Sequence, residues 1–461
     1  MSLQSLSKNL FLAFVFFLPF QMVYFLREPF IHGEKWQYGT VAVYASDGIL
    51  FLVLILFFVS GGYIRKIFDF RYWILDLKSR IKHLKSESAL LVALILWAGL
   101  SIMWVPDRFL AGYFFVKLSL AVGLFLAVRS LGERSVRGVI LALIIGAVLE
   151  SVLGIGQFLT QSTFASTWLG MSAHEAGLAG TSVLKIDGQR WLRAYGTFPH
   201  PNMLGGFLAV VFTLGVGYAT FYGEKYIRTV LLSRAELRES GASLQDRFWD
   251  TVRMAGIVVA LAVILLGLIL TFSRSAWLGA VLGTIAYGIW CIKYPVWRKP
   301  YFWILGVLGI AAVVFIGLLH ETVFPRFDTA VIEREGSVSE RVQSLRDAER
   351  VIGEGNLLLG TGVGNFTAAV MLLEPVRPVW SVQPAHNVPV LIFAELGLVG
   401  FLLFVGFLVF SLSSILKSRI INPESTILIV LLPSLFLDHW IWTSHFGLFF
   451  FFLLLGFAVR K

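Results

Sequence analysis

The segment QPAHNVPVLIFAELG, residues 383–397, places a histidine at the mouth of a long apolar run. Pro389 would fall in the first helical turn, where a missing N–H costs little, so we expect a helix to begin beside His386. A neutral imidazole near pH 7 can accept a proton from a hydroxyl nucleophile. A lone histidine is more often packed or hydrogen-bonded, so a catalytic role needs further groups nearby.

Three arginines supply such groups. They are Arg193 in RAYGTFPHPN, Arg274 in TFSRSAWLG and Arg341 in SERVQSLRDAER. Each also has a simpler explanation: a loop arginine, an arginine that snorkels to lipid headgroups, and a solvated helix face. If they converge, phosphate is the expected ligand, because the guanidinium fork binds its oxygens bidentately and keeps its charge. A base beside such a cluster suggests transfer from a phosphate leaving group to a hydroxyl.

Several other chemistries lack their motifs. The sequence has no P-loop, no paired-cysteine site, no HExxH and no acidic DxD-type pair, and its one cysteine, Cys291, excludes an internal disulfide. An enzyme built on these residues would neutralise its leaving group with arginine and not with Mg²⁺. We therefore expect neither a metal nor a cofactor.

The composition indicates the compartment. Of the 461 residues, 57% are hydrophobic and only 14% are charged, as in a polytopic membrane protein. The formal charge of +10 lies mostly in short loops between apolar runs, so it reflects membrane topology and does not predict a nucleic-acid partner. The expected surroundings are a lipid bilayer.

About twelve runs meet the length of roughly 20 residues that a membrane helix needs. They lie near 10–26, 40–60, 89–105, 109–129, 137–159, 200–222, 254–272, 275–292, 302–319, 387–415, 425–438 and 441–459. The first lacks a small-residue cleavage site, so we expect a retained helix. Basic loops such as 60–86 place both termini in the cytoplasm. The fold class expected is all-α, with one integral membrane domain over residues 1–461.

Two outer segments are long enough to need a function, 161–199 and 320–386. The second contains an amphipathic pattern that predicts a helix near 340–354. Ser339 is a candidate N-cap, and Gly353 and Gly355 would end the helix.

Charged residues inside apolar runs are costly unless they have partners or face a cavity. Besides Arg274 they are Asp47, Lys117, Glu150, Glu395 and Asp438, with Gln157 as a neutral companion. Asp47 and Lys117 could pair with each other. Glu150 could equally be a structural hydrogen-bonding group.

The motifs resemble those of the bacterial O-antigen ligase family, which includes lipid-linked glycan ligases and polymerases. The family's last signature is His-Asn, nine residues, Gly, two residues, Gly, and it is matched in full from His386-Asn387 to Gly397 and Gly400. RAYGTFPHPNMLGGFLAV, TFSRSAWLG and the GTGVGNF turn occur in the family's order, so the likeness covers residues 190 to 405. The first 150 residues carry only a topological likeness.

The resemblance implies a C-type glycosyltransferase fold in a bacterial inner membrane, with a lid-like periplasmic loop. It implies a metal-independent transfer of a glycan from undecaprenyl diphosphate to an acceptor hydroxyl at the periplasmic face. On matched motifs, His386 would activate or orient the acceptor, and the diphosphate would be held by Arg193, Arg274 and Arg341. Supporting roles are expected for Asn387, His200, Asn202 and Glu395.

The resemblance leaves the acceptor open between the lipid A core, a growing polysaccharide and a protein. The short tail Arg460-Lys461 after the last span disfavours the protein acceptor of an O-oligosaccharyltransferase. A polysaccharide transporter would spread its charges through the midplane, whereas the residues above cluster on one side. A purely structural subunit would not need two long outer loops.

Overall fold

The structure of this protein, a computed structural model, describes residues 3–59, 87–129, 131–231, 244–328, 337–417 and 423–460. The basic loop 60–86, on which part of the expected topology rests, lies outside these residues, as do positions 329–336 of the long segment 320–386.

The chain is mostly helical. Among the described residues, seven helices are long and apolar enough to cross a membrane: α7 Arg108–Arg129, α8 Glu133–Thr160, α9 Pro201–Leu231, α11 Leu244–Leu270, α12 Arg274–Lys293, α13 Pro295–Leu318 and α18 Val388–Lys417. Five shorter apolar helices lie in the remaining expected runs: α1 Leu3–Phe17, α2 Ala45–Val59, α6 Glu87–Ser101, α19 Ile427–Leu437 and α21 His445–Ala458. The protein is therefore a polytopic membrane protein.

The N-terminal part corrects two expected spans. The run 10–26 is helical only to Phe17, and its last residues form β1 Val23–Arg27. The run 40–60 begins as β4 Val41–Tyr44, which pairs antiparallel with β1. Both strands are rich in valine and aromatic residues, which favour strands, but hydropathy alone does not separate a short apolar strand from a helix.

Short β-ribbons also correct the expected all-α class. Besides β1 and β4, the described residues form two more antiparallel pairs: β2 Phe30–Ile31 with β3 Glu34–Lys35, and β5 Val183–Ile186 with β6 Gln189–Leu192. The β5–β6 hairpin lies within the segment 161–199.

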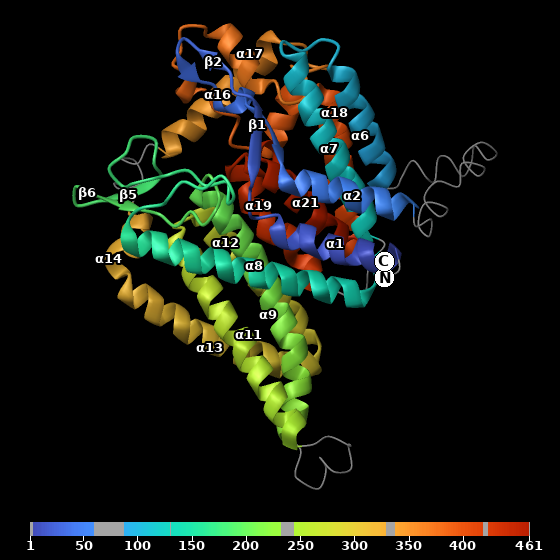
Figure 1. The fold of residues 1–461 in the computed structure, drawn as a ribbon, viewed down its shortest axis with the longest axis vertical. Helices are drawn as coiled ribbons and strands as arrows, with labels where there is room; N and C mark the ends of the chain where they lie inside the picture. Colours follow the sequence, from blue (N-terminus) through green and yellow to red (C-terminus); the bar gives the residue numbers. More distant parts are fainter. Residues whose placement is uncertain are drawn as a thin grey trace, which may run out of the picture.

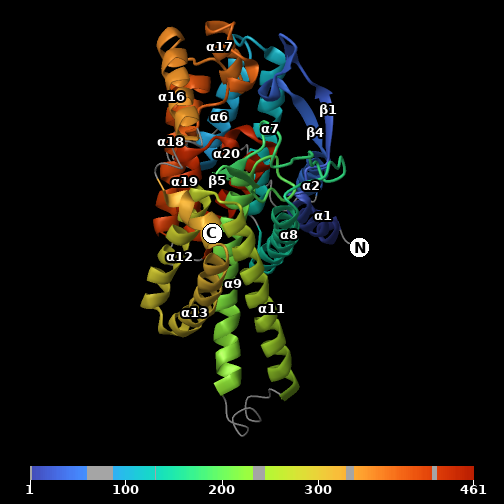
Figure 2. The same ribbon diagram turned by 90° about the vertical axis from the view of Figure 1, so that its left-hand side faces the viewer.

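The core is built around α9 and α21. Every residue of α21 is buried, and its phenylalanines pack against Phe207 of α9. In Figures 1 and 2 the α9–α11 pair extends to one end of the molecule, while α16, α17 and the β2 strand cover the opposite end. Helices α9, α12 and α18 begin, and α19 ends, between these two regions.

The segment 320–386 forms a helical cap. It contains α14 His320–Val323, the 3₁₀ turn η2 Phe324–Phe327, α16 Ser337–Glu354, α17 Phe366–Leu373 and the 3₁₀ turn η3 Val379–Ser381. Helix α16 begins two residues before the expected cap at Ser339, which lies instead in its first turn. Two ion pairs hold α16 to the residues that follow α17. Arg377 Nη1 lies 2.8 Å from Asp347 Oδ2, and Glu374 pairs with Arg350.

A glycine kink in α18 explains the spacing of the His-Asn…Gly motif. Gly397 has φ 64° and ψ −170° inside the helix, and a Cβ there would meet the Leu358 carbonyl. The incoming loop is bound at this point, because the Leu398 amide donates to Leu357 at 2.9 Å. Only glycine satisfies both the backbone conformation and the close approach.

Candidate active site

His386 is held by the start of α18 and by α16. Asn387 caps α18, its Oδ1 accepting the Val390 amide at 3.0 Å. The backbone amide and Nδ1 of His386 lie 3.1 and 3.2 Å from the Ser344 hydroxyl of α16. Ser344 donates to the Arg341 carbonyl at 2.9 Å, so it accepts from His386. This assigns the proton to Nδ1 and leaves Nε2 as the basic atom.

Arg193, at the end of β6, is 7% exposed and bound on all three nitrogens. Nε donates to the Thr271 carbonyl at 2.7 Å, Nη1 to Ser182 at 2.8 Å and Nη2 to Asn202 at 2.8 Å. Asn202 in turn donates to Asp438 at 2.9 Å. The amide therefore stands between the guanidinium and the carboxylate and fixes the orientation of both.

Asp438 and His439 occupy the turn between α19 and the short helix α20 Trp440–Thr443. The His439 ring lies edge to face against His386, with ring centroids 4.8 Å apart. The same ring also packs against Tyr38, with ring centroids 5.7 Å apart. Tyr38 belongs to the 3₁₀ turn η1 Gln37–Gly39. His439 Nδ1 lies 2.8 Å from the Thr443 hydroxyl, which fixes the ring.

The electrostatic surroundings keep both imidazoles neutral. Burial, with the Arg341 charge, holds the pKa of His386 below its ordinary value, and Asp438 opposes this shift. Burial and the neighbouring His386 lower the pKa of His439 to about 3. Burial alone would raise the pKa of Asp438, but the three surrounding histidines and the Asn202 hydrogen bond lower it overall. Asp438 is thus a carboxylate beside neutral bases.

His200 joins the same cluster from the start of α9. Its Nδ1 accepts the Asn202 amide at 3.1 Å, and its side chain is exposed. The charges of Arg193, Arg341 and Asp438 all act on this ring. The structure thus brings together five of the residues expected from the sequence: His386, Arg193, Arg341, His200 and Asn202.

The positions of Arg274 and Glu395 differ from those of the five residues in the cluster. Arg274 is the first residue of α12, three positions after Thr271, whose carbonyl binds Arg193. Its backbone therefore lies beside the anchor of Arg193, and its side chain is half-buried. Glu395 accepts from the Trp442 indole at 3.0 Å and from the backbone of the glycine turn at Gly364. It supports the packing of α18 and not the cluster.

Glu150 and Gln157 of α8 hold the loop between Arg193 and His200. Glu150 accepts from the Thr197 amide at 2.8 Å and from its hydroxyl at 2.7 Å. Gln157 Oε1 accepts the amides of the residues at 195 and 196, at 3.0 and 2.8 Å. Glu150 is therefore a hydrogen-bonding group that fixes the loop behind Arg193.

The pairing expected for Asp47 and Lys117 is confirmed. Lys117 Nζ binds the Asp47 carboxylate and lies 3.1 Å from His445 Nδ1. His445 Nε2 contacts the Ser46 hydroxyl at 2.7 Å. This buried network joins α2, α7 and α21.

Four residues of the cluster were not anticipated: Ser344, Tyr38, His439 and Thr443. Asp438 was noted only as a costly charge. The polar dipeptide Asp438-His439 separates two apolar runs, and this break was the sequence signal that could have identified both residues. Ser344 and Tyr38 have no distinguishing sequence context.

Comparison with known proteins gives a family match over part of the chain. Residues 259–405 match the model of a family described as O-antigen ligase, and this stretch includes Arg274, Arg341 and His386. No curated protein matches the chain. The matched stretch carries the full His-Asn…Gly signature, together with the helices α12, α16 and most of α18. Residues 259–405 are therefore similar to the O-antigen ligase family.

Proposed function

We propose that this protein transfers a preassembled glycan from undecaprenyl diphosphate to an acceptor hydroxyl. The observation that carries the proposal is the meeting of a neutral histidine base and two arginines, from three separate segments, around His200 and Asp438. An arginine cluster suits a diphosphate, and a neutral imidazole suits a hydroxyl.

In the proposed reaction, Arg193 and Arg341 hold the diphosphate, and Arg274 joins them from the start of α12. Nε2 of His386 takes the proton of the acceptor hydroxyl. The acceptor oxygen forms a bond to the anomeric carbon as the bond from that carbon to the phosphate oxygen breaks. The electron pair leaves with the diphosphate, and the fixed guanidinium charges stabilise it. No metal enters this scheme.

The proposed setting is a bacterial inner membrane with both termini in the cytoplasm. Segments 161–199 and 320–386 would then be periplasmic, and the site would open to that side. The lipid A core is the acceptor we favour. A growing polysaccharide is the second candidate, because ligases and polymerases share the motif set.

A reconstituted assay tests the proposal. Purified protein in liposomes would receive lipid-linked glycan extracted from the host's membranes, an acceptor glycolipid from a strain that lacks the donor, and EDTA. We expect a new covalent product whose formation EDTA does not reduce. Movement of the glycolipid across the bilayer without a new bond would indicate a transporter. A product that EDTA abolishes would contradict the arginine-based scheme.

A further inference from the structure

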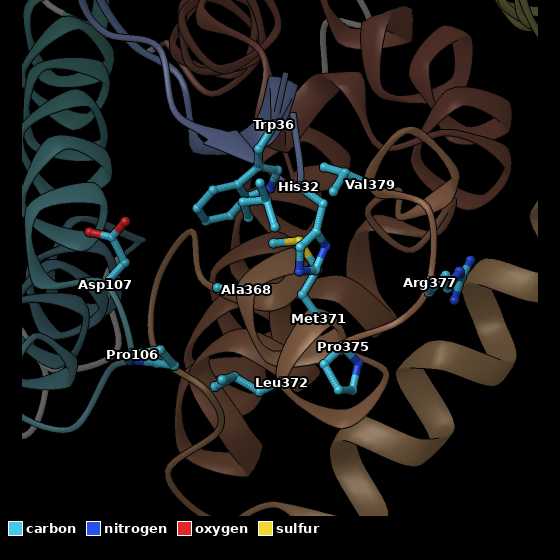
Figure 3. A pocket seen from close by; sticks show the side chains of 11 residues that line it. His32, Trp36, Pro106, Asp107, Ala368, Met371, Leu372, Pro375, Arg377 and Val379 are labelled. Carbon is cyan, nitrogen blue, oxygen red and sulfur yellow. The ribbon is translucent and has the colours of Figure 1, made fainter. Parts of the chain in front are cut away.

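A hollow lies on the capped end of the molecule, apart from the His386 cluster. It has a volume of about 290 Å³ and is walled by three segments far apart in the sequence: the β2–β3 hairpin, the turn before α7, and α17 with the residues that follow it. Figure 3 shows His32, Trp36 and Met371 converging on this hollow, with Asp107 and Arg377 at its opposite sides. We call it the hairpin pocket.

The walls of the hairpin pocket are mostly carbon. Met371, Leu372 and Pro375 line one side, and Trp36 lines another. The Trp36 indole N–H donates to the Thr367 hydroxyl at 3.3 Å. The polar edge of the indole is therefore engaged by the protein. Trp36 is only 6% exposed, so it contributes a small aromatic area to the pocket.

Both charged residues of the rim are already neutralised. Asp107 receives two hydrogen bonds from Arg27, at 3.1 and 2.7 Å. Arg377 donates to both carboxylate oxygens of Asp347, at 2.9 and 2.8 Å. A charged ligand would have to compete with these pairs, so the pocket favours an uncharged one.

His32 supplies the polar group. His32 and Gly33 have φ of 51° and 82°, the two left-handed residues of a type I′ turn that joins β2 to β3. The turn presents an exposed imidazole beside Met371, where the ring can donate or accept one hydrogen bond. A small aromatic area, aliphatic walls and one hydrogen-bonding ring together suit the apolar face and the hydroxyls of a sugar.

The hairpin pocket is joined to the His386 cluster through η1. Trp36 immediately precedes this turn, and Tyr38 within it contacts the His439 ring at 5.7 Å. Trp36, at the start of this turn, thus lines the pocket, while Tyr38, within the turn, packs against the cluster. A glycan chain with its reacting end at His386 could reach the pocket along this turn.

We propose that the hairpin pocket binds one neutral sugar ring of a glycan whose reacting end lies at the His386 cluster. The proposal rests on the proposed function and extends it, because it assigns a binding subsite away from the reacting atoms. The glycan is either that of the lipid-linked donor or that of the acceptor.

Two variants remove the pocket without touching the cluster. His32→Gly deletes the imidazole and keeps a turn that glycine adopts readily. Leu372→Trp adds a ring at the rim, where Leu372 is 69% exposed. The matched control is Leu178→Trp, the same change at a 50% exposed leucine of the segment 161–199.

Donor and acceptor would be varied separately in the liposome assay. We expect each pocket variant to raise the KM of one of them about three- to tenfold, as the loss of one hydrogen bond would, with kcat unchanged. The substrate whose KM rises identifies the source of the sugar. Unchanged KM values for both substrates, or the same rise in the control, would overturn the proposal.

A binding measurement separates this proposal from the transfer reaction. Saturation-transfer NMR on the full-length protein would use two probes: oligosaccharide released from the donor lipid and oligosaccharide released from the acceptor. We expect signal from one of them, weakened in Leu372→Trp and retained in His386→Ala. Equal signals in the wild type and in Leu372→Trp would refute the pocket, even if transfer were confirmed. Signal from added short-chain detergent that competes with the sugar would point to an acyl chain and equally overturn it.

Discussion

The imidazoles of His386 and His439 lie edge to face, with centroids 4.8 Å apart and planes at 81°. His439 is fixed by Thr443 and Tyr38, and its low pKa keeps it neutral. A neutral ring held in this way positions His386.

Replacement of His439 separates this positioning from proton transfer. We expect His439→Phe, which keeps an aromatic face, to retain most of the transfer rate. His439→Ala should lower kcat about a hundredfold, because the base loses its orientation. The measurement is kcat for both variants, with thermal unfolding as a check on folding. Equal inactivation of both would show that the nitrogen of His439 matters and not its ring.

The pH profile tests the electrostatics of His386. The base is active when neutral, and its pKa lies below the ordinary 6.5, so kcat/KM should be flat near neutrality and fall only in the acid range. Asp438 raises the pKa of His386, so Asp438→Asn should move this acid limb to lower pH. Arg341 lowers it, so the residual activity of Arg341→Gln should show the limb at higher pH. Shifts in the same direction would contradict the assignment.

Arginine-to-lysine variants test phosphate binding. A lysine keeps the charge but lacks the bidentate fork, so Arg274→Lys and Arg341→Lys should each lose most activity. The exposed Arg346 of α16 offers a control, because Arg346→Lys should leave the rate unchanged. The readout is the initial rate at several donor concentrations. Full activity of Arg274→Lys would remove that residue from the proposed site.

The loop behind Arg193 predicts a stability effect. Glu150→Ala leaves the buried Thr197 amide without its acceptor and should cost about 1–3 kcal/mol. Glu150→Gln keeps a carbonyl oxygen and should lose less. Thermal unfolding in detergent measures the cost, and the donor KM reports any displacement of Arg193. An unchanged melting temperature for Glu150→Ala would show that the carboxylate does not hold this loop.

Residue type and hydropathy were enough to predict that Arg193, Arg341 and His386 lie in one cluster. Arg193, Arg341 and His386 each stand next to a span or loop helix, and those positions follow from hydropathy and charge. The partners of Asp438 could not be predicted, because Asn202 lies 236 positions away and hydrogen-bonds to it only once α9 packs against α19. Ser344 and Tyr38 have common types in ordinary contexts, so their roles depend on tertiary contacts.

The N-terminal spans show the limit of hydropathy. The β1–β4 ribbon is as apolar as a membrane helix, and the pairing of Val23 with Tyr44 is not visible in either run alone. The kink at Gly397 was also hidden, although the motif glycine that causes it was identified. Local composition shows that a segment is apolar more readily than it shows whether that segment is a helix or a strand.

The most direct test of the account is product formation by His386→Ala beside the wild type, in liposomes with donor and acceptor at saturation. His320→Ala, at an exposed histidine of α14, controls for the loss of an imidazole. We predict that the wild type and His320→Ala form the glycosylated acceptor, and that a correctly inserted His386→Ala forms it at least about a hundredfold more slowly. Transfer by His386→Ala at the wild-type rate would contradict the central claim.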